Sequence, residues 1–276
     1  MRQVFGLLLS DRDSDQAHLI NLGLLSYIVG RLSNGLSAYR MMYMVDSAII
    51  LAGGKGERLR PVTNDRPKSM VEVGDRPILA YQVEQLKKGG ISKIVFACSW
   101  MRDILQAHVG NGRDYGIEAS YSIEDSPLGR GGGIKQAMSM LSEPWDSVVV
   151  TNGDNLWRLD IADLIEKHTV SNAMATLVVV PLKSPYGIVE FDEAYRVLGF
   201  REKPVLPHWV NAGIYVFSKE IYDLLPDEGD HETETFPKLS PDRFLVYKSD
   251  SYWRGVDTVK DLTEAQKEVK EFFSDL

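Results

Sequence analysis

Residues 47–61 read SAIILAGGKGERLRP, and this stretch decides the fold class. Its first six residues form a short apolar run, which is typical of a fully buried β-strand. A loop with three glycines (Gly53, Gly54 and Gly56) follows at once. Glycines let the backbone approach a phosphate and turn its N–H groups toward it. A buried strand leading into such a loop predicts an open α/β sheet with a ligand at the carboxyl end of its strands.

From residue 46 onward, strand-like apolar runs alternate with helical patterns. Strands are predicted at 93–98, 117–122, 147–151 and 175–180, and helices at 78–88, 101–109, 132–141 and 161–169. This alternation predicts a Rossmann-like, mainly parallel (mixed) sheet with helices on both faces. After residue 181 the runs at 187–191, 197–202, 212–217 and 244–248 predict a small antiparallel section, and the pattern at 259–272 predicts a final helix. We expect one domain over residues 45–276.

Composition excludes several classes of protein. The 276 residues carry a formal net charge of −8, which disfavours nucleic acid or an anionic membrane as the main partner. Cys98 is the single cysteine, so an intrachain disulfide and a cysteine-rich zinc site are excluded. We therefore expect a cytoplasmic protein. The sequence leaves a homo-oligomer open.

Residues 1–44 form an N-terminal extension of uncertain status. Its apolar runs, 4–9 and 19–30, are shorter than the roughly 20 residues that span a bilayer, and no signal-peptide pattern is present. We therefore expect no membrane segment here. The alternative is that translation begins at Met41, Met42 or Met44.

The glycine loop matches neither of two common nucleotide-binding motifs. A dinucleotide fingerprint needs a third glycine where Leu59 stands, and a P-loop needs Gly-Lys-Ser/Thr. What remains is a loop that ends in Arg58, with Lys68 ten residues later. A triphosphate that loses pyrophosphate needs fixed cations against its developing charge, and these two side chains suit that task.

Two further clusters follow strands on the same side of the predicted sheet. One is EDSPLGRGGG at 124–133, which opens a helix, and the other is NGD at 152–154. Asp154 places a carboxylate just past an apolar strand. A triphosphate site needs hard oxygen ligands for Mg²⁺, usually one or two carboxylates with substrate phosphates and water, so we expect Mg²⁺ as the cofactor.

Taken in order, these motifs resemble those of the nucleoside-diphosphate-sugar pyrophosphorylases, the sugar-1-phosphate nucleotidyltransferases. The matching stretches are LAGGKGERLRP (51–61), PKSM (67–70), EDSPLGRGG (124–132), NGD (152–154), YGIVE (186–190), EKP (202–204), NAGIY (211–215) and WRGVDT (253–258). The likeness runs from about residue 47 to 265. It implies a GT-A-like fold, a nucleoside triphosphate and a sugar 1-phosphate as substrates, and in-line attack on the α-phosphorus without a covalent intermediate.

The resemblance also implies a role for each matching residue. Arg58 and Lys68 match catalytic cations, and Asp154 matches a magnesium ligand. The sugar-phosphate contacts match Gly187, Glu202, Lys203 and Asn211. The nucleotide contacts match Leu51, Ala52, Gly53, Gly54, Glu124, Pro127, Gly129, Asn152 and Gly153.

One segment departs from the family pattern. Many members read Trp-x-Asp-apolar-Gly-Thr, with the Asp as second magnesium ligand, whereas Gly255 and Asp257 have exchanged places here. Residues two apart in an extended segment point to the same side, about 6.5–7 Å apart. We therefore expect Asp257 to serve the same metal after a modest backbone shift, in a form that resembles the superfamily's cytidylyltransferases. The alternative is that Asp257 only caps the final helix.

The base and the sugar remain open at this point. Glu124 can accept N1–H and N2–H₂ of guanine, or N3–H of uracil or thymine. The overall pattern is most similar to short mannose-1-phosphate guanylyltransferases, with uridylyl-, cytidylyl- or thymidylyltransferases as alternatives. Because the chain ends soon after the last helix, we expect no hexapeptide-repeat acetyltransferase domain. A catalytically silent regulatory relative and a glycosyltransferase are the rival classes; the missing Asp-x-Asp motif argues against the second.

Overall fold

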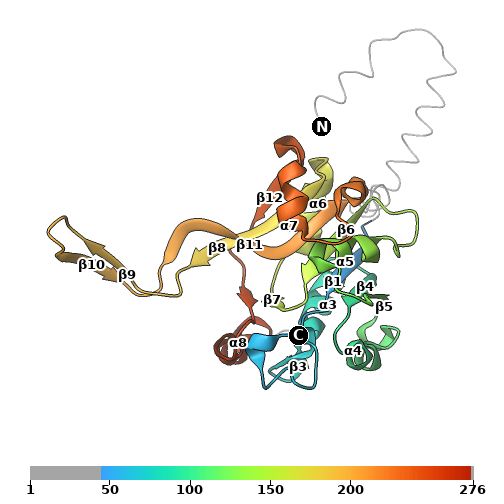
Figure 1. Ribbon diagram of the computed structural model, residues 1–276, viewed down its shortest axis with the longest axis horizontal. Helices are drawn as coiled ribbons and strands as arrows, with labels where there is room; N and C mark the ends of the chain where they lie inside the picture. The colour runs from blue at the N-terminus through green and yellow to red at the C-terminus, as the bar shows by residue number, and fades with distance from the viewer. Residues whose placement is uncertain (1–44, 275–276) are drawn as a thin grey trace, which may run out of the picture. The chain divides into compact units, whose positions relative to one another are not determined.

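The computed structural model describes residues 45–274, and the expectations for residues 1–44 lie outside this range. Its centre is a seven-stranded sheet in the order β12-β8-β11-β6-β1-β4-β5 (Figure 1). The strands are β1 (Ser47–Leu51), β4 (Lys93–Cys98), β5 (Glu118–Ile123), β6 (Ser147–Asn152), β8 (Ala175–Lys183), β11 (Val205–Ser218) and β12 (Phe244–Lys248). Every neighbouring pair is parallel except the two that β11 forms, with β6 and with β8. The predicted mixed α/β sheet is confirmed.

Helices cover both faces of this sheet because successive residues of the central strand point to opposite sides. Ala48 and Ile50 of β1 belong to a core cluster with residues of α3 (Ile78–Lys88), α4 (Arg102–Val109) and α6 (Ile161–Val170). Ile49 belongs to a second cluster, together with residues of α5 (Gly129–Met138). The last helix, α8 (Val259–Phe272), packs in a third cluster with Leu59 and Tyr81.

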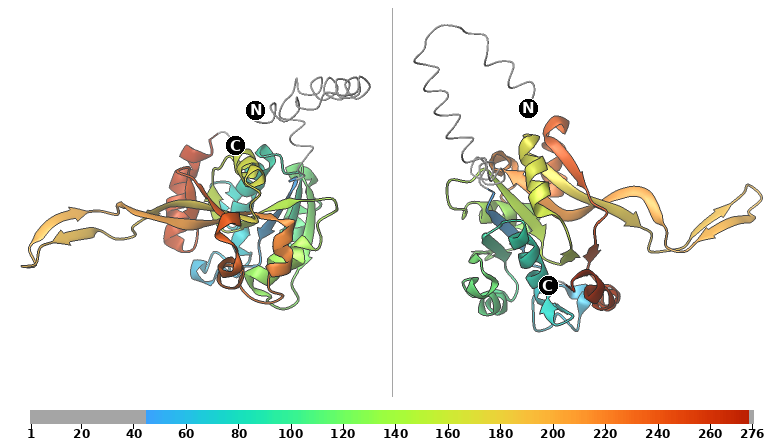
Figure 2. Two further views of the ribbon diagram at one scale, coloured as in Figure 1. Left: turned by 90° about the horizontal axis from the view of Figure 1, so that it is seen from above. Right: turned by 180° about the vertical axis from the view of Figure 1, so that it is seen from behind.

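The region after residue 181 differs from the sequence-based expectation. Of the four strands expected there, β9 (Ile188–Phe191) and β10 (Val197–Arg201) form a separate antiparallel pair. Residues 212–217 belong to β11, which is buried over that stretch and therefore lies inside the main sheet, while β12 forms its edge. We call residues 184–204 the arm, and Figures 1 and 2 show it projecting from the body of the described part.

Two short antiparallel pairs complete the sheet structure. They are β2 (Glu72–Val73) with β3 (Arg76–Pro77), and β7 (Asn155–Trp157) with β13 (Trp253–Gly255). The short helix α7 (His231–Glu234) lies between β11 and β12 in the sequence. Within residues 45–274, the helices are too short or too polar to cross a membrane.

Candidate functional site

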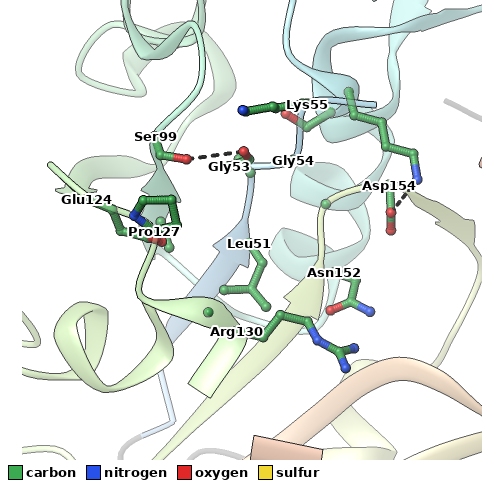
Figure 3. A pocket seen from close by; sticks show the side chains of 16 residues that line it. Leu51, Gly53, Gly54, Lys55, Ser99, Glu124, Pro127, Arg130, Asn152 and Asp154 are labelled. Atoms are coloured by element: carbon green, nitrogen blue, oxygen red, sulfur yellow. Dashed lines mark hydrogen bonds and ion pairs between the residues drawn. The ribbon is translucent and has the colours of Figure 1, made fainter. Parts of the chain in front are cut away.

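A cavity of about 410 Å³ opens at the carboxyl ends of β1 and β6 (Figure 3). Its position agrees with the rule that ligands of open α/β sheets bind at this edge. All nine residues predicted to contact the nucleotide line it, and so do Lys68 and Asp154. The full lining is Leu51, Ala52, Gly53, Gly54, Lys55, Lys68, Ser69, Ala97, Ser99, Glu124, Pro127, Gly129, Arg130, Asn152, Gly153 and Asp154.

Backbone contacts hold the two loops of this cavity together. The N–H of Gly153 donates to the carbonyl oxygen of Leu51 at 3.0 Å. A Cβ on Gly153 would lie 2.6 Å from that same oxygen, so only glycine fits there. The N–H of Lys68 donates to the Gly54 carbonyl at 3.3 Å, which fixes the start of the Lys68 turn against the glycine loop. The loops are therefore set by main-chain geometry.

Lys68 joins two carboxylates that come from distant parts of the chain. Its Nζ donates to Asp154 Oδ2 and to Asp257 Oδ1, both at 2.6 Å, and its side chain is only 10% exposed. Arg58 is exposed and donates through Nη2 to the same Asp257 oxygen at 2.8 Å. Burial alone would raise the pKa of Asp257, but the Lys68 hydrogen bond and the charges of Lys68 and Arg58 outweigh it and leave this pKa lowered. The carboxylate therefore stays ionised.

Main-chain pairing explains how Asp257 reaches this place. β13 pairs with β7 so that Gly255 lies opposite Asn155, and the N–H of Val256 donates to the carbonyl of Asp154 at 3.1 Å. The next side chain, Asp257, then lies beside the Asp154 loop. The alternative that Asp257 caps the final helix is wrong, because Thr258 is the N-cap and forms a capping box with Asp261.

The donor set fits a hard divalent cation. Asp154 and Asp257 converge on one ammonium group, and the buried Oδ1 of Asn152, which also lines the cavity, accepts no hydrogen bond within the described residues. Mg²⁺ is usually held by one or two carboxylates together with substrate phosphates and water. No larger group of His, Cys, Asp or Glu ligands is present in residues 45–274. Asp154 and Asp257 are therefore the residues here that suit it.

Glu124 lies across the cavity from Asp154 (Figure 3). One of its oxygens accepts the N–H of Leu128 at 3.1 Å, while the other faces Gly133, where an added Cβ would lie 2.7 Å away. The carboxylate is thus oriented at the start of α5. It can accept N–H groups from the edge of a base.

Arg130, which was not among the predicted site residues, lies in the cavity wall. Its guanidinium forms a pair of hydrogen bonds with Glu232, at 2.9 and 2.8 Å, and another with Asp230 at 2.7 Å. Glu232 Oε1 also accepts from Tyr215 at 2.8 Å and from Asn211 Nδ2 at 2.9 Å. Arg130 stood within the quoted glycine cluster, but its partners lie some 100 residues away, and no local pattern reveals them.

The four residues predicted to bind the sugar phosphate are divided between two places. Asn211 belongs to the Arg130 network beside the cavity, and Gly213, two residues later, packs against Asn152. Gly187, Glu202 and Lys203 lie on the arm and do not line the cavity. Lys203 has a φ of 44°, an unusual conformation for a non-glycine residue and more so before a proline.

Cys98 ends β4 behind the cavity wall and is buried. Burial raises the pKa of its thiol to about 11, so the sulfur stays protonated at neutral pH. This argues against covalent catalysis by cysteine.

Comparison with known proteins agrees with this geometry. A family model described as nucleotidyl transferase matches residues 47–271. The chain belongs to this family. It is 35% identical over 231 residues to a mannose-1-phosphate guanylyltransferase of Mycobacterium tuberculosis, covering 80% of this chain and 64% of that protein. A D-glycero-alpha-D-manno-heptose 1-phosphate guanylyltransferase of Aneurinibacillus thermoaerophilus is 34% identical, with 82% of this chain and 99% of that protein covered.

A solved structure gives the same result for the nucleotidyltransferase fold. HddC from Yersinia pseudotuberculosis, complexed with GMP-PN, has a TM-score of 0.67 and 27% identity to this chain. The match covers 82% of this chain and all of that one. The chain thus spans just under two thirds of the mycobacterial relative but nearly all of the heptose enzyme and of HddC.

Proposed function

We propose that this chain is a sugar-1-phosphate nucleotidyltransferase that joins GTP and mannose 1-phosphate, or a closely similar manno-configured sugar 1-phosphate, and releases pyrophosphate. The observation that carries the proposal is the cluster at the cavity wall. Hydrogen bonds link Arg58 to Asp257, Asp257 to Lys68, and Lys68 to Asp154. Lys68 and Asp154 also line the cavity, beside the glycine loop. The family match and the two guanylyltransferase relatives support the same reaction.

In the proposed mechanism, the glycine loop and Glu124 hold the nucleotide, and Arg58 and Lys68 stand beside the reacting phosphates. A sugar-phosphate oxygen attacks the α-phosphorus in line, and pyrophosphate leaves with its charge offset by the two cations. Mg²⁺, held by Asp154 and Asp257, would supply further charge neutralisation. Arg58 is exposed, and in the described part of the chain it pairs with a single carboxylate, so it can turn toward a triphosphate.

Glu124 and the relatives support guanine as the base. Glu124 lines the cavity with one carboxylate oxygen held by the Leu128 N–H, and guanine offers N1–H and N2–H₂ side by side on one edge. The sugar choice follows from the names of the two relatives, because mannose and D-glycero-D-manno-heptose share the manno ring configuration.

The test is pyrophosphate release with Mg²⁺, crossing GTP, UTP, CTP, dTTP and ATP against several hexose 1-phosphates and the manno-heptose 1-phosphate. Release that needs GTP and a manno-configured sugar phosphate is expected. Glu124→Gln should lower kcat/KM for GTP by about 10- to 100-fold, since it weakens hydrogen bonds to a charged acceptor. Preference for UTP or dTTP would overturn the assignment of the base, and silence with every pair would overturn the reaction.

A further inference from the structure

The arm, residues 184–204, exposes an unusual amount of apolar surface. Among the strands of residues 45–274, β9 and β10 of the arm pair only with each other. Large apolar side chains lie open along the arm and the adjoining start of β11: Tyr186 (76% exposed), Val189, Phe191 (61%), Tyr195 (84%), Val197, Leu198, Phe200 (63%), Val205 and Trp209. Elsewhere in the described residues, exposed apolar side chains of this size are scattered singly.

Such an arm needs a partner. A two-stranded hairpin is marginal in water by itself, and contiguous apolar patches of several hundred Å² mark interaction surfaces. The four aromatic side chains of the arm present on the order of 500 Å². The aliphatic side chains bring this toward the roughly 800 Å² that each partner buries in a standard interface. The patch is therefore the right size for a folded protein.

The charges of the arm indicate which protein it fits. Arg201 pairs with Glu190, and Arg196 with Asp192, so these charges are satisfied within the arm. Within residues 45–274, Glu202 and Lys203 have no ion pair. They lie beside Gly187, where an added Cβ would be 3.1 Å from the Glu202 carboxylate. These two side chains match the sugar-phosphate contacts of the family, yet the cavity of their own chain is lined without them.

We infer that the arm docks on a second copy of this chain and brings its Glu202 and Lys203 to the cavity of that copy. The inference rests on the proposed function. β11 runs from Asn211, beside the cavity, directly into the arm, so an exchange of arms between two copies keeps every strand pairing intact. Exchange of identical elements closes a two-fold dimer at low cost. Each active site is then built from both copies.

Trans-complementation tests this arrangement. Lys68→Met removes a cation of the body and Lys203→Met one of the arm, so each homodimer should have little activity. The two variants, co-expressed with different tags and purified through both, should recover roughly half of wild-type activity, because each mixed dimer keeps one intact site. The control is a mixed dimer with both substitutions on one chain and neither on the other. With exchanged arms this dimer has no intact site and should stay inactive. If each site were built within one chain, this control would be active and the first mixed dimer would be inactive, which would overturn the inference.

A second measurement concerns the interface itself. Phe191→Ser with Tyr195→Ser removes two stacked, exposed rings of the arm, whose centroids are 6.5 Å apart, and should convert dimer to monomer in sedimentation. Val170→Ser, which removes an equally exposed apolar side chain at the end of α6, should leave the dimer intact. A wild-type chain that is monomeric and fully active would show that the arm folds back on its own cavity. A wild-type chain that is dimeric but inactive would instead refute the proposed reaction.

Discussion

Substitution Lys68→Met gives the sharpest test of the carboxylate cluster. The ammonium lies 2.6 Å from an oxygen of Asp154 and 2.6 Å from an oxygen of Asp257, and it is almost buried. Methionine has a similar length but no charge. The variant therefore leaves two ionised carboxylates facing each other without a cation between them.

The expected loss of stability follows from Coulomb's law. Two unit charges about 5 Å apart repel by about 0.8 kcal/mol in water and by about 3 kcal/mol at an effective dielectric constant of 20. The side chains of Asp154 and Asp257 are 33% and 44% exposed, so solvent screens part of this repulsion. We expect a loss of about 1–2 kcal/mol, which lowers Tm by roughly 2–8 °C in a domain of this size.

Thermal unfolding in EDTA and in millimolar MgCl₂, without nucleotide, separates this effect from a packing defect. Mg²⁺ binds the folded state and should raise Tm further for Lys68→Met than for the wild type, because it replaces the missing cation. Lys55→Met is the matched control, because the Lys55 ammonium lies over the Trp100 ring, 5.5 Å from its centroid, and not between two carboxylates. Mg²⁺ should therefore change its Tm no more than that of the wild type. Equal Tm values for Lys68→Met and wild type in EDTA would refute the claim that Lys68 stabilises the two carboxylates. A Tm deficit that Mg²⁺ does not reduce would refute the claim that Mg²⁺ binds between them in place of the ammonium.

Thr258→Ala removes the N-cap of α8 and should lower the free energy of unfolding by about 1 kcal/mol, measured by urea denaturation, whereas Thr263→Ala within the exposed helix should have less effect. Burial lowers the pKa of His168 to about 4, whereas the same side chain in the unfolded chain takes up a proton near pH 6.5. The free energy of unfolding should therefore fall by about 2 kcal/mol from pH 7 to pH 5. His168→Asn should flatten this dependence of the free energy of unfolding on pH. The double exchange Gly255→Asp with Asp257→Gly should lose Mg²⁺-dependent stabilisation, because residue 255 packs against Asn155 rather than Lys68; retention of the Mg²⁺ effect would contradict this.

Local pattern was sufficient to predict most of the elements. The helix at 78–88 and the strands at 93–98 and 244–248 have the expected bounds, because glycine, proline or polar residues end each apolar pattern. The position of residues 212–217 could not be predicted in this way. Their apolar run is equally consistent with a buried central strand and with a separate antiparallel section, and only the packing of β6 and β8 on both sides decides between them.

The candidate site shows the same limit. The glycine loop, Glu124 and Asp154 each follow a parallel strand of one sheet, and the carboxyl ends of such strands lie at the same edge. Their convergence on a single cavity could therefore be predicted from the order of strands in the sequence. The Arg130–Glu232 pair depends on how α7 packs against α5, about 100 residues later in the chain. Long-range pairs of this kind carry no local periodic signal.

The exchange of Gly255 and Asp257 becomes understandable from the pairing of β13 with β7. The register places Gly255 opposite Asn155, and the Val256 N–H on the Asp154 carbonyl fixes where the next side chain lies. A carboxylate two residues later along the same segment therefore still meets the Asp154 loop, and Lys68 reaches both. Thr258 caps α8, which leaves the Asp257 side chain free for this contact. The backbone thus keeps a two-carboxylate site although the order of the two residues has changed, and this argues against a silent relative that has lost its metal-binding side chains.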